Sequence, residues 1–146
     1  MSHFVFLLMR LRSPLQLLAA RVYGPDRDAA EVSALALLDA AGTPVSFHGL
    51  VGGPGSDLIQ AQFHGACETL LLSDWYHLTR RSGPFPLERS MPGLPAEPRV
   101  ATYQRQLDQL LALIQGRPHN LASFDEALSV QMLIENILKQ AYSTHS

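Results

Sequence analysis

Apolar and polar residues alternate through much of the stretch between residues 32 and 75, which is the pattern of strands with one buried side. Residues 32–39 and 45–51 alternate in this way, residues 58–64 do so most cleanly, and residues 69–73 are more uniformly apolar. The pattern predicts four successive strands, in a sheet with one apolar and one polar face.

Glycine-rich segments at residues 39–42, 52–55 and 65–67 separate these strands. Glycine adopts the positive backbone angles that tight reversing turns require. Connections this short favour antiparallel neighbours, because a parallel crossover needs about a dozen residues or more. We therefore expect a mostly antiparallel sheet.

The N-terminal residues predict a helix, because apolar side chains recur with the spacing of one helical face at Phe4, Leu7, Leu8 and Leu11. Ser2 can cap this helix, and Pro14 ends it by excluding the preceding residue from the helical region. Residues 15–23 then predict a strand, closed by a turn at residues 24–26.

The C-terminal third predicts two helices. The first covers about residues 101–115, ends at Gly116, and has one apolar face at Leu107, Leu110, Leu111 and Ile114. The second begins with a capping box from Ser123 to Glu126. Its expected buried face is Ala127, Val130, Ile134, Ile137, Leu138 and Ala141.

Residues 82–98 hold five prolines and two glycines, which predicts a long loop between the strands and the helices. Such a loop is either functional or mobile, or it is a plain surface connection; the sequence leaves both open. Together these elements predict an α+β fold, with a mostly antiparallel open-faced sheet, an N-terminal helix and a C-terminal helix pair. The length of 146 residues fits a single domain over residues 1–146.

Charge and composition narrow the possible partners. The formal net charge is -2 and the arginines are scattered, so we expect no nucleic acid partner. Cys67 is the only cysteine, which excludes an internal disulfide and fits the cytoplasm. The apolar run at residues 4–9 is too short to cross a bilayer, so we expect no membrane span.

The densest polar and aromatic cluster is Asp74, Trp75, Tyr76 and His77. It could bind a sugar-like ligand by ring stacking, or Trp75 could instead close a sheet edge. His48 and His64 could share the polar face of the sheet, but no third ligand has a suitable spacing, so we expect no metal site. Cys67 has no arginine or histidine immediately beside it to activate it, so we expect no catalytic thiol.

The order of elements resembles the C-terminal domain of the Gfo/Idh/MocA oxidoreductases, the glucose-fructose oxidoreductase and inositol dehydrogenase family. The resemblance covers nearly the whole chain and lies in residues 2–4, 34–42, 63–75 and 114–135. It implies an open sheet that holds a substrate and pairs subunits, beside a Rossmann domain for NAD or NADP. It also implies that His3 occupies the position of a histidine that transfers a proton.

This sequence departs from the family pattern in its cofactor half. A dinucleotide site needs a G-x-G-x-x-G turn between a strand and a helix, whereas residues 49–55 lie between two predicted strands and include Pro54. The family's catalytic lysine has no counterpart, because Lys139 is the only lysine. We expect no cofactor-binding residues here, and the aspartate that partners His3 in the family would precede Met1, as in a truncated chain.

Two hypotheses follow. In the first, the chain is the substrate-binding and oligomerisation half of an NAD(P)-dependent sugar or polyol dehydrogenase, inactive alone, that forms a homo-oligomer through the sheet face. In the second, it is a freestanding, non-catalytic dimerisation or ligand-binding module that uses the same face.

Overall fold

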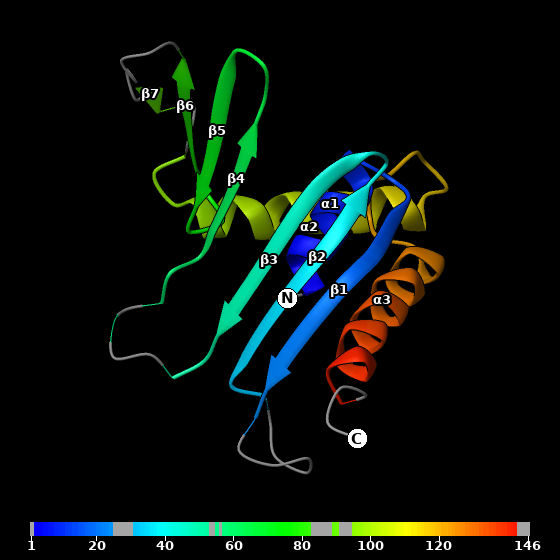
Figure 1. Ribbon diagram of the computed structural model, residues 1–146. Helices are drawn as coiled ribbons and strands as arrows, with labels where there is room; N and C mark the ends of the chain where they lie inside the picture. Colours follow the sequence, from blue (N-terminus) through cyan, green and yellow to red (C-terminus); the bar gives the residue numbers. More distant parts are fainter. Residues whose placement is uncertain are drawn as a thin grey trace. The chain divides into compact units, whose positions relative to one another are not determined.

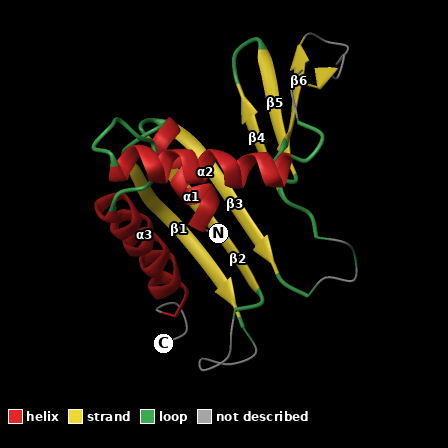
Figure 2. Ribbon diagram, turned by 180° about the vertical axis from the view of Figure 1, so that it is seen from behind, coloured by secondary structure: helices red, strands yellow, loops and turns green. Residues whose placement is uncertain are grey.

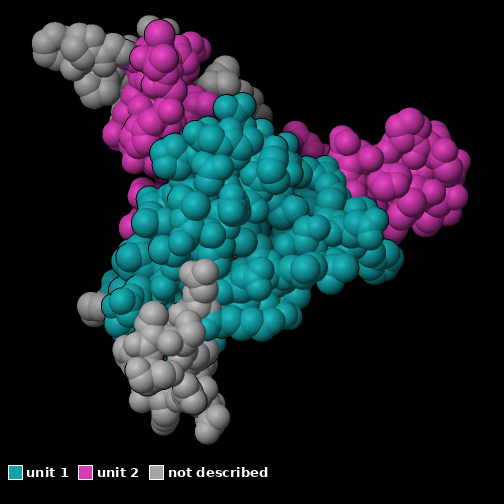
Figure 3. Space-filling model, turned by 45° about the vertical axis from the view of Figure 1, so that its right-hand side comes forward, with its two compact units in different colours: residues 1–55, 122–146 teal, residues 56–121 magenta. Residues whose placement is uncertain are grey.

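A computed structural model describes residues 2–24, 31–52, 55, 57–82, 89–90 and 95–142. The chain divides into two compact units, residues 1–55 with 122–146 and residues 56–121 (Figure 3). We call them unit 1 and unit 2 and treat each by itself. Predicted segments within residues 25–30, 53–54, 83–88 and 91–94, which include most of the proline-rich loop, lie outside the described residues.

Unit 1 is a three-stranded antiparallel sheet with two helices. Its strands are β1 (Leu15–Tyr23), β2 (Ser33–Ala40) and β3 (Thr43–Leu50), in the order β1-β2-β3 (Figure 1). Its helices are α1 (Ser2–Leu11) and α3 (Phe124–Tyr142). The predicted strand at residues 15–23 is confirmed at both ends, and the Ser13–Pro14 peptide bond before it is cis.

The β2–β3 hairpin closes through the two residues Ala41 and Gly42, whose φ angles are 48° and 81°. Positive angles at both positions match the right-handed twist of the flanking strands, and glycine adopts them without strain. The carboxylate of Asp39 accepts a hydrogen bond from the Gly42 N–H at 3.0 Å. The predicted turn at residues 39–42 is therefore confirmed.

The core of unit 1 lies between the helices and one face of the sheet. Its buried residues come from α1, β2 and α3 and are Val5, Ala36, Leu38, Val130, Leu133 and Ile137. Figure 2 shows α1 in front of this face of the sheet, with α3 along β1. The predicted face of α3 is right at Val130 and Ile137 but omitted Leu133, and Ala127 is exposed.

The predicted face of α1 is wrong. Val5 is 1% exposed and forms the contact with the core, while Leu11 is 59% exposed. Phe6 and Met9 also pack against the core. The N-terminal run is apolar on every side, so its spacing does not select one face, and packing against β2 and α3 decides it.

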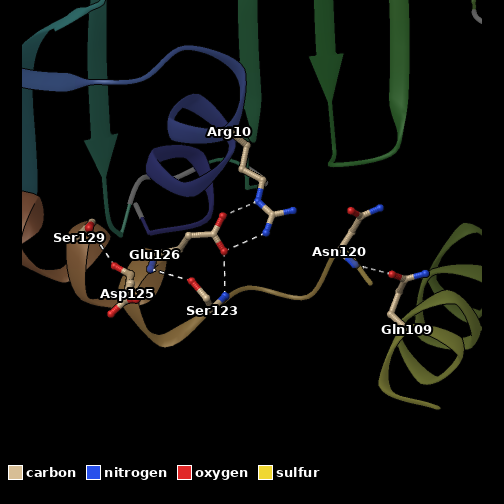
Figure 4. Close-up of polar contacts among 7 residues, drawn as sticks. All are labelled: Arg10, Gln109, Asn120, Ser123, Asp125, Glu126 and Ser129. Carbon is tan, nitrogen blue, oxygen red and sulfur yellow. Dashed lines mark hydrogen bonds and ion pairs between the residues drawn. The ribbon is translucent and has the colours of Figure 1, made fainter. Parts of the chain in front are cut away.

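The start of α3 is fixed by the predicted capping box (Figure 4). The Ser123 N–H donates to Glu126 Oε2 at 2.8 Å, and the Glu126 N–H donates to Ser123 Oγ at 3.1 Å. Arg10 of α1 adds two hydrogen bonds to the same carboxylate, both at 2.9 Å. The Arg10 side chain, and then the Ser123 backbone, lower the pKa of Glu126 to about 2.

Unit 2 contains a separate antiparallel sheet in the order β4-β5-β6-β7, together with one helix. Its elements are β4 (Gln60–His64), β5 (Glu68–Ser73), β6 (His77–Ser82), β7 (Arg89–Ser90) and α2 (Pro98–Ile114). The sequence did not predict β6, because its mostly polar side chains lack an apolar rhythm. Gly116, with φ 66°, follows α2 as predicted.

The fold class is α+β, as predicted, but the strands do not form one sheet. Residues 51–59 separate β3 from β4, and the two strands belong to different sheets. A hairpin of two to five residues imposes pairing on its flanking strands, whereas a connection of this length does not. Within the described residues, no helix is both long and apolar enough to cross a membrane.

Candidate functional site

The main candidate is the face of the unit 1 sheet that lies opposite α1 and α3. Within the described part of unit 1, no helix lies over it, and Figure 1 looks directly onto it. We call it the open sheet face. It consists of residues 33, 35, 37 and 39 of β2 and their partners, 16, 19, 21 and 23 of β1 and 44, 46, 48 and 50 of β3.

The open sheet face is apolar at its centre. Leu35 and Leu37 of the central strand β2 are 44% and 47% exposed, and Leu50, at the end of β3, is 65% exposed. They alternate with the buried Ala36 and Leu38, so the pleat of β2 places leucine on both faces. The sequence predicted one polar face; this holds for Ser46 and His48 of β3 but is wrong for β2.

Charged residues are few on the open sheet face. Arg21 of β1 and Asp39 of β2 are the charged residues of the three strands, and both lie on this face. Arg21, Leu35 and His48 form one row across the sheet, because Leu35 pairs with both other residues. A leucine therefore separates a cation from an imidazole in the same row.

His3, the candidate proton-transfer residue, lies in the first turn of α1 and is exposed. It belongs to unit 1, whereas the predicted ligand cluster at residues 74–77 belongs to unit 2. Their proposed roles stay predictions.

The cluster Asp74, Trp75, Tyr76 and His77 forms the β5–β6 hairpin. Ser73 pairs with His77, and the loop between them has φ angles of 50° at Asp74 and 66° at Trp75. Left-handed angles are uncommon for non-glycine residues, and a bulky side chain there signals strain or function. Trp75 is 38% exposed at this turn, so its ring could contact a ligand.

His48 and His64 do not share a sheet. His48 lies on the open sheet face of unit 1, and His64 ends β4 in unit 2, with its Nδ1 3.4 Å from Thr69 Oγ1. Among the described residues, no group of three or more histidine, cysteine or acidic side chains could hold a metal ion. Cys67 is exposed.

A concave surface runs between β1 and α3 in unit 1. Its walls are Leu15, Gln16 and Leu17 from the strand, and Ser129, Met132, Leu133, Asn136 and Lys139 from the helix. Lys139 lies 3.7 Å from Glu135, which offsets its charge locally. This groove therefore combines apolar walls with three uncharged polar side chains.

Sequence reasoning identified a sheet face but not the leucines at its centre. The signal was present, because residues 34–38 are apolar at every position, which is typical of a strand with two apolar faces. Comparisons with protein-family models, with curated proteins and with solved structures find no match to this chain.

Proposed function

We propose that this chain is the association and substrate-holding part of an oxidoreductase similar to the Gfo/Idh/MocA family, and that the open sheet face binds a second copy of the chain. The observation that carries the proposal is the exposure of Leu35, Leu37 and Leu50 on a face that no helix in the described part of unit 1 covers. Contiguous exposed leucines on a sheet are a common mark of an interaction surface.

A second copy is a suitable occupant because the face can complement itself. Each copy offers a central apolar strip flanked by polar residues, which is the arrangement of an interface core and rim. In an isologous dimer the same patch serves both subunits, and two sheets stack with their inner side chains interleaved. The leucines of one copy then cover those of the other.

The area of the open sheet face limits how tightly two copies can bind each other. Strands of eight residues, with a rise of about 3.3 Å per residue and a spacing of about 4.8 Å, give a projected area of roughly 400 Å². Stable interfaces bury about 800 Å² on each partner. We therefore expect a reversible dimer with a dissociation constant in the micromolar range.

The test is sedimentation velocity over a concentration series into the hundreds of micromolar. Leu37→Glu places a charge at the centre of the face and is expected to give a monomer at all concentrations. Leu128→Glu on α3 is the matched control, because Leu128 is 59% exposed and lies outside the core. A wild-type chain that stays monomeric, or equal effects of both variants, would overturn the proposal.

The oxidoreductase part of the proposal draws support from the order of elements. A helix, antiparallel strands and a helix pair follow one another, although the strands form two sheets and not the single open sheet that the resemblance implies. The implied NAD or NADP would bind a separate Rossmann domain, since this sequence has no G-x-G-x-x-G turn. Fluorescence titration with NADH and NADPH is expected to show no saturable binding, and tight binding by this chain would contradict the account.

The alternative is a freestanding dimerisation or ligand-binding module without a catalytic role. The same exposed leucines favour it, so a ligand experiment must separate the two. The oxidoreductase proposal predicts that a polyol such as inositol binds, and that Trp75→Ala weakens binding while Tyr103→Ala, at another exposed aromatic residue, does not. A dimer with no polyol binding favours the module.

A further inference from the structure

We infer that association through the open sheet face weakens as the pH falls from about 8 to about 5.5, because His48 must be uncharged when the face is buried. The inference rests on the proposed self-association and adds a control to it. Imidazole is the side chain whose ordinary titration lies in this pH range.

His48 lies on β3, directly beside the apolar strip of β2. It pairs with Leu35 of β2, and its neighbours on the same face of β3 are Ser46 and Leu50. Both leucines are exposed in the single chain and would be buried in the dimer. Burial in apolar surroundings disfavours a charged imidazole, so the protonated form opposes association.

The charged groups around His48 act in the same direction. In aligned sheet packing, the strands of the two copies run either antiparallel or parallel. In the antiparallel case β3 faces β3 and the two imidazoles approach each other. In the parallel case β3 faces β1, and each imidazole meets the partner's Arg21, which lies in the same row.

Within one copy, Asp39 lies too far from His48 to offset this repulsion. It lies on β2, four residues from Leu35, which is roughly 13 Å along the strand from the row of His48. Its carboxylate also accepts the hydrogen bond from the Gly42 N–H at 3.0 Å. Asp39 and Arg21 are the two charged residues of the three strands.

The magnitude follows from proton linkage. A solvated imidazole is about 90% protonated at pH 5.5, so releasing its proton weakens association by about tenfold. Each dimer buries two such groups. We therefore expect the dissociation constant to rise by at least about tenfold and up to about 100-fold between pH 8 and pH 5.5.

The experiment is sedimentation velocity of the full chain at both pH values, with circular dichroism as the check of folding. Wild type is expected to show the loss of association at pH 5.5, and His48→Gln is expected to change less than about threefold. His64→Gln, at an exposed histidine of unit 2, is the matched control and should behave as wild type. His48→Lys, which is charged throughout, should associate weakly even at pH 8.

The outcomes separate this inference from the proposed function. If wild type forms a Leu37-dependent dimer at pH 8 but His48→Gln keeps the full pH response, or if association tightens at pH 5.5, the inference is wrong and the proposed function stands. If no dimer forms at pH 8, both are wrong.

Discussion

Units 1 and 2 are both built on antiparallel strands, but among the residues whose burial the structure describes, only the sheet of unit 1 contributes to a buried core. In unit 1, every second residue of β2 is buried, namely Ala34, Ala36, Leu38 and Ala40. In unit 2, none of the residues of β4, β5 and β6 is buried. The same secondary structure is therefore stabilised in two ways, by packing in unit 1 and by strand pairing in unit 2.

The comparison shows that a sheet can leave one face exposed when its other face is buried in a core. The two helices of unit 1 cover one side of β2, and burial of that side stabilises the sheet while the other side stays accessible. The strands of unit 2 lack such a buried side and are joined by local contacts. One of these is the ion pair of Glu68 with Arg80, which contributes little to stability because both side chains are exposed. We therefore expect unit 1 to resist unfolding better.

The largest test of this comparison uses two adjacent leucines of β2. Leu38 is 1% exposed and Leu37 is 47% exposed. Leu38→Ala should lower the free energy of unfolding by about 2–5 kcal/mol, because it leaves a cavity in the core. Leu37→Ala should change it by less than about 1 kcal/mol. Urea unfolding followed by circular dichroism at low protein concentration measures both.

Equal losses from these two variants would break the comparison. They would mean that both faces of β2 are packed, so that the open sheet face would not be available to a second copy. A large loss for Leu38→Ala alone would establish the asymmetry that the proposed function requires.

A smaller effect is expected at the end of α2 in unit 2. Gly116 has φ 66°, and the Arg117 N–H donates to the Ala112 carbonyl at 2.8 Å across it. An alanine in this left-handed conformation costs roughly 1–2 kcal/mol. Gly116→Ala should therefore speed amide exchange at Arg117 by about tenfold.

Gly55→Ala is the control for this change. A Cβ at either glycine meets no atom within 4 Å, but only Gly116 has a positive φ. A similar response of the Arg117 amide to both substitutions would show that the backbone angle at Gly116 is not the cause.

The smallest expected effect is the loss of stability in acid that comes from the contact of Arg10 in α1 with Glu126 in α3. The pKa of Glu126 is lowered to about 2 in the folded chain, so its ionised form stabilises the fold above its ordinary pKa of 4.5. That contribution is lost as the pH falls from about 4.5 toward 2. Glu126→Gln should therefore lower the melting temperature at pH 7, and the difference from wild type should shrink at pH 2.5.

Glu135→Gln serves as the comparison for the acid experiment. Glu135 forms an exposed ion pair with Lys139 at 3.7 Å, a geometry that contributes little. Its melting temperature should stay close to that of wild type at both pH values. If the Glu126→Gln difference were constant with pH, the link from Arg10 to Glu126 would not stabilise unit 1 through its charge.

Much of the fold could be predicted because its signals are local. The alternation in residues 45–50, the turn at Asp39 to Gly42 and the capping box at Ser123 each depend on a few neighbouring residues. The buried face of α1 could not be predicted, because the run around Val5 is apolar on all sides. The division into two sheets depends on long-range pairing, which a local pattern does not encode.

The candidate site was predicted only in outline. Alternation identified a sheet face that includes His48, but Leu35 and Leu37 look the same in the sequence as the buried Ala36 and Leu38. Which side of β2 faces the helices depends on where α1 and α3 pack. The sequence identified the polar and aromatic residues of the hairpin at Asp74, but only the structure shows the positive φ angles of its backbone.

The irregularity in β1 has a consequence for solubility. Its pairing with β2 shifts register between Leu17 and Ala19, which leaves Leu18 as an inserted residue at 58% exposure. An insertion of this kind in a border strand bends it and interrupts the regular row of amides and carbonyls that a foreign strand would copy. The irregularity therefore disfavours fibre-like growth along that border, and in the proposed dimer the copies would meet through the broad surface of the sheet.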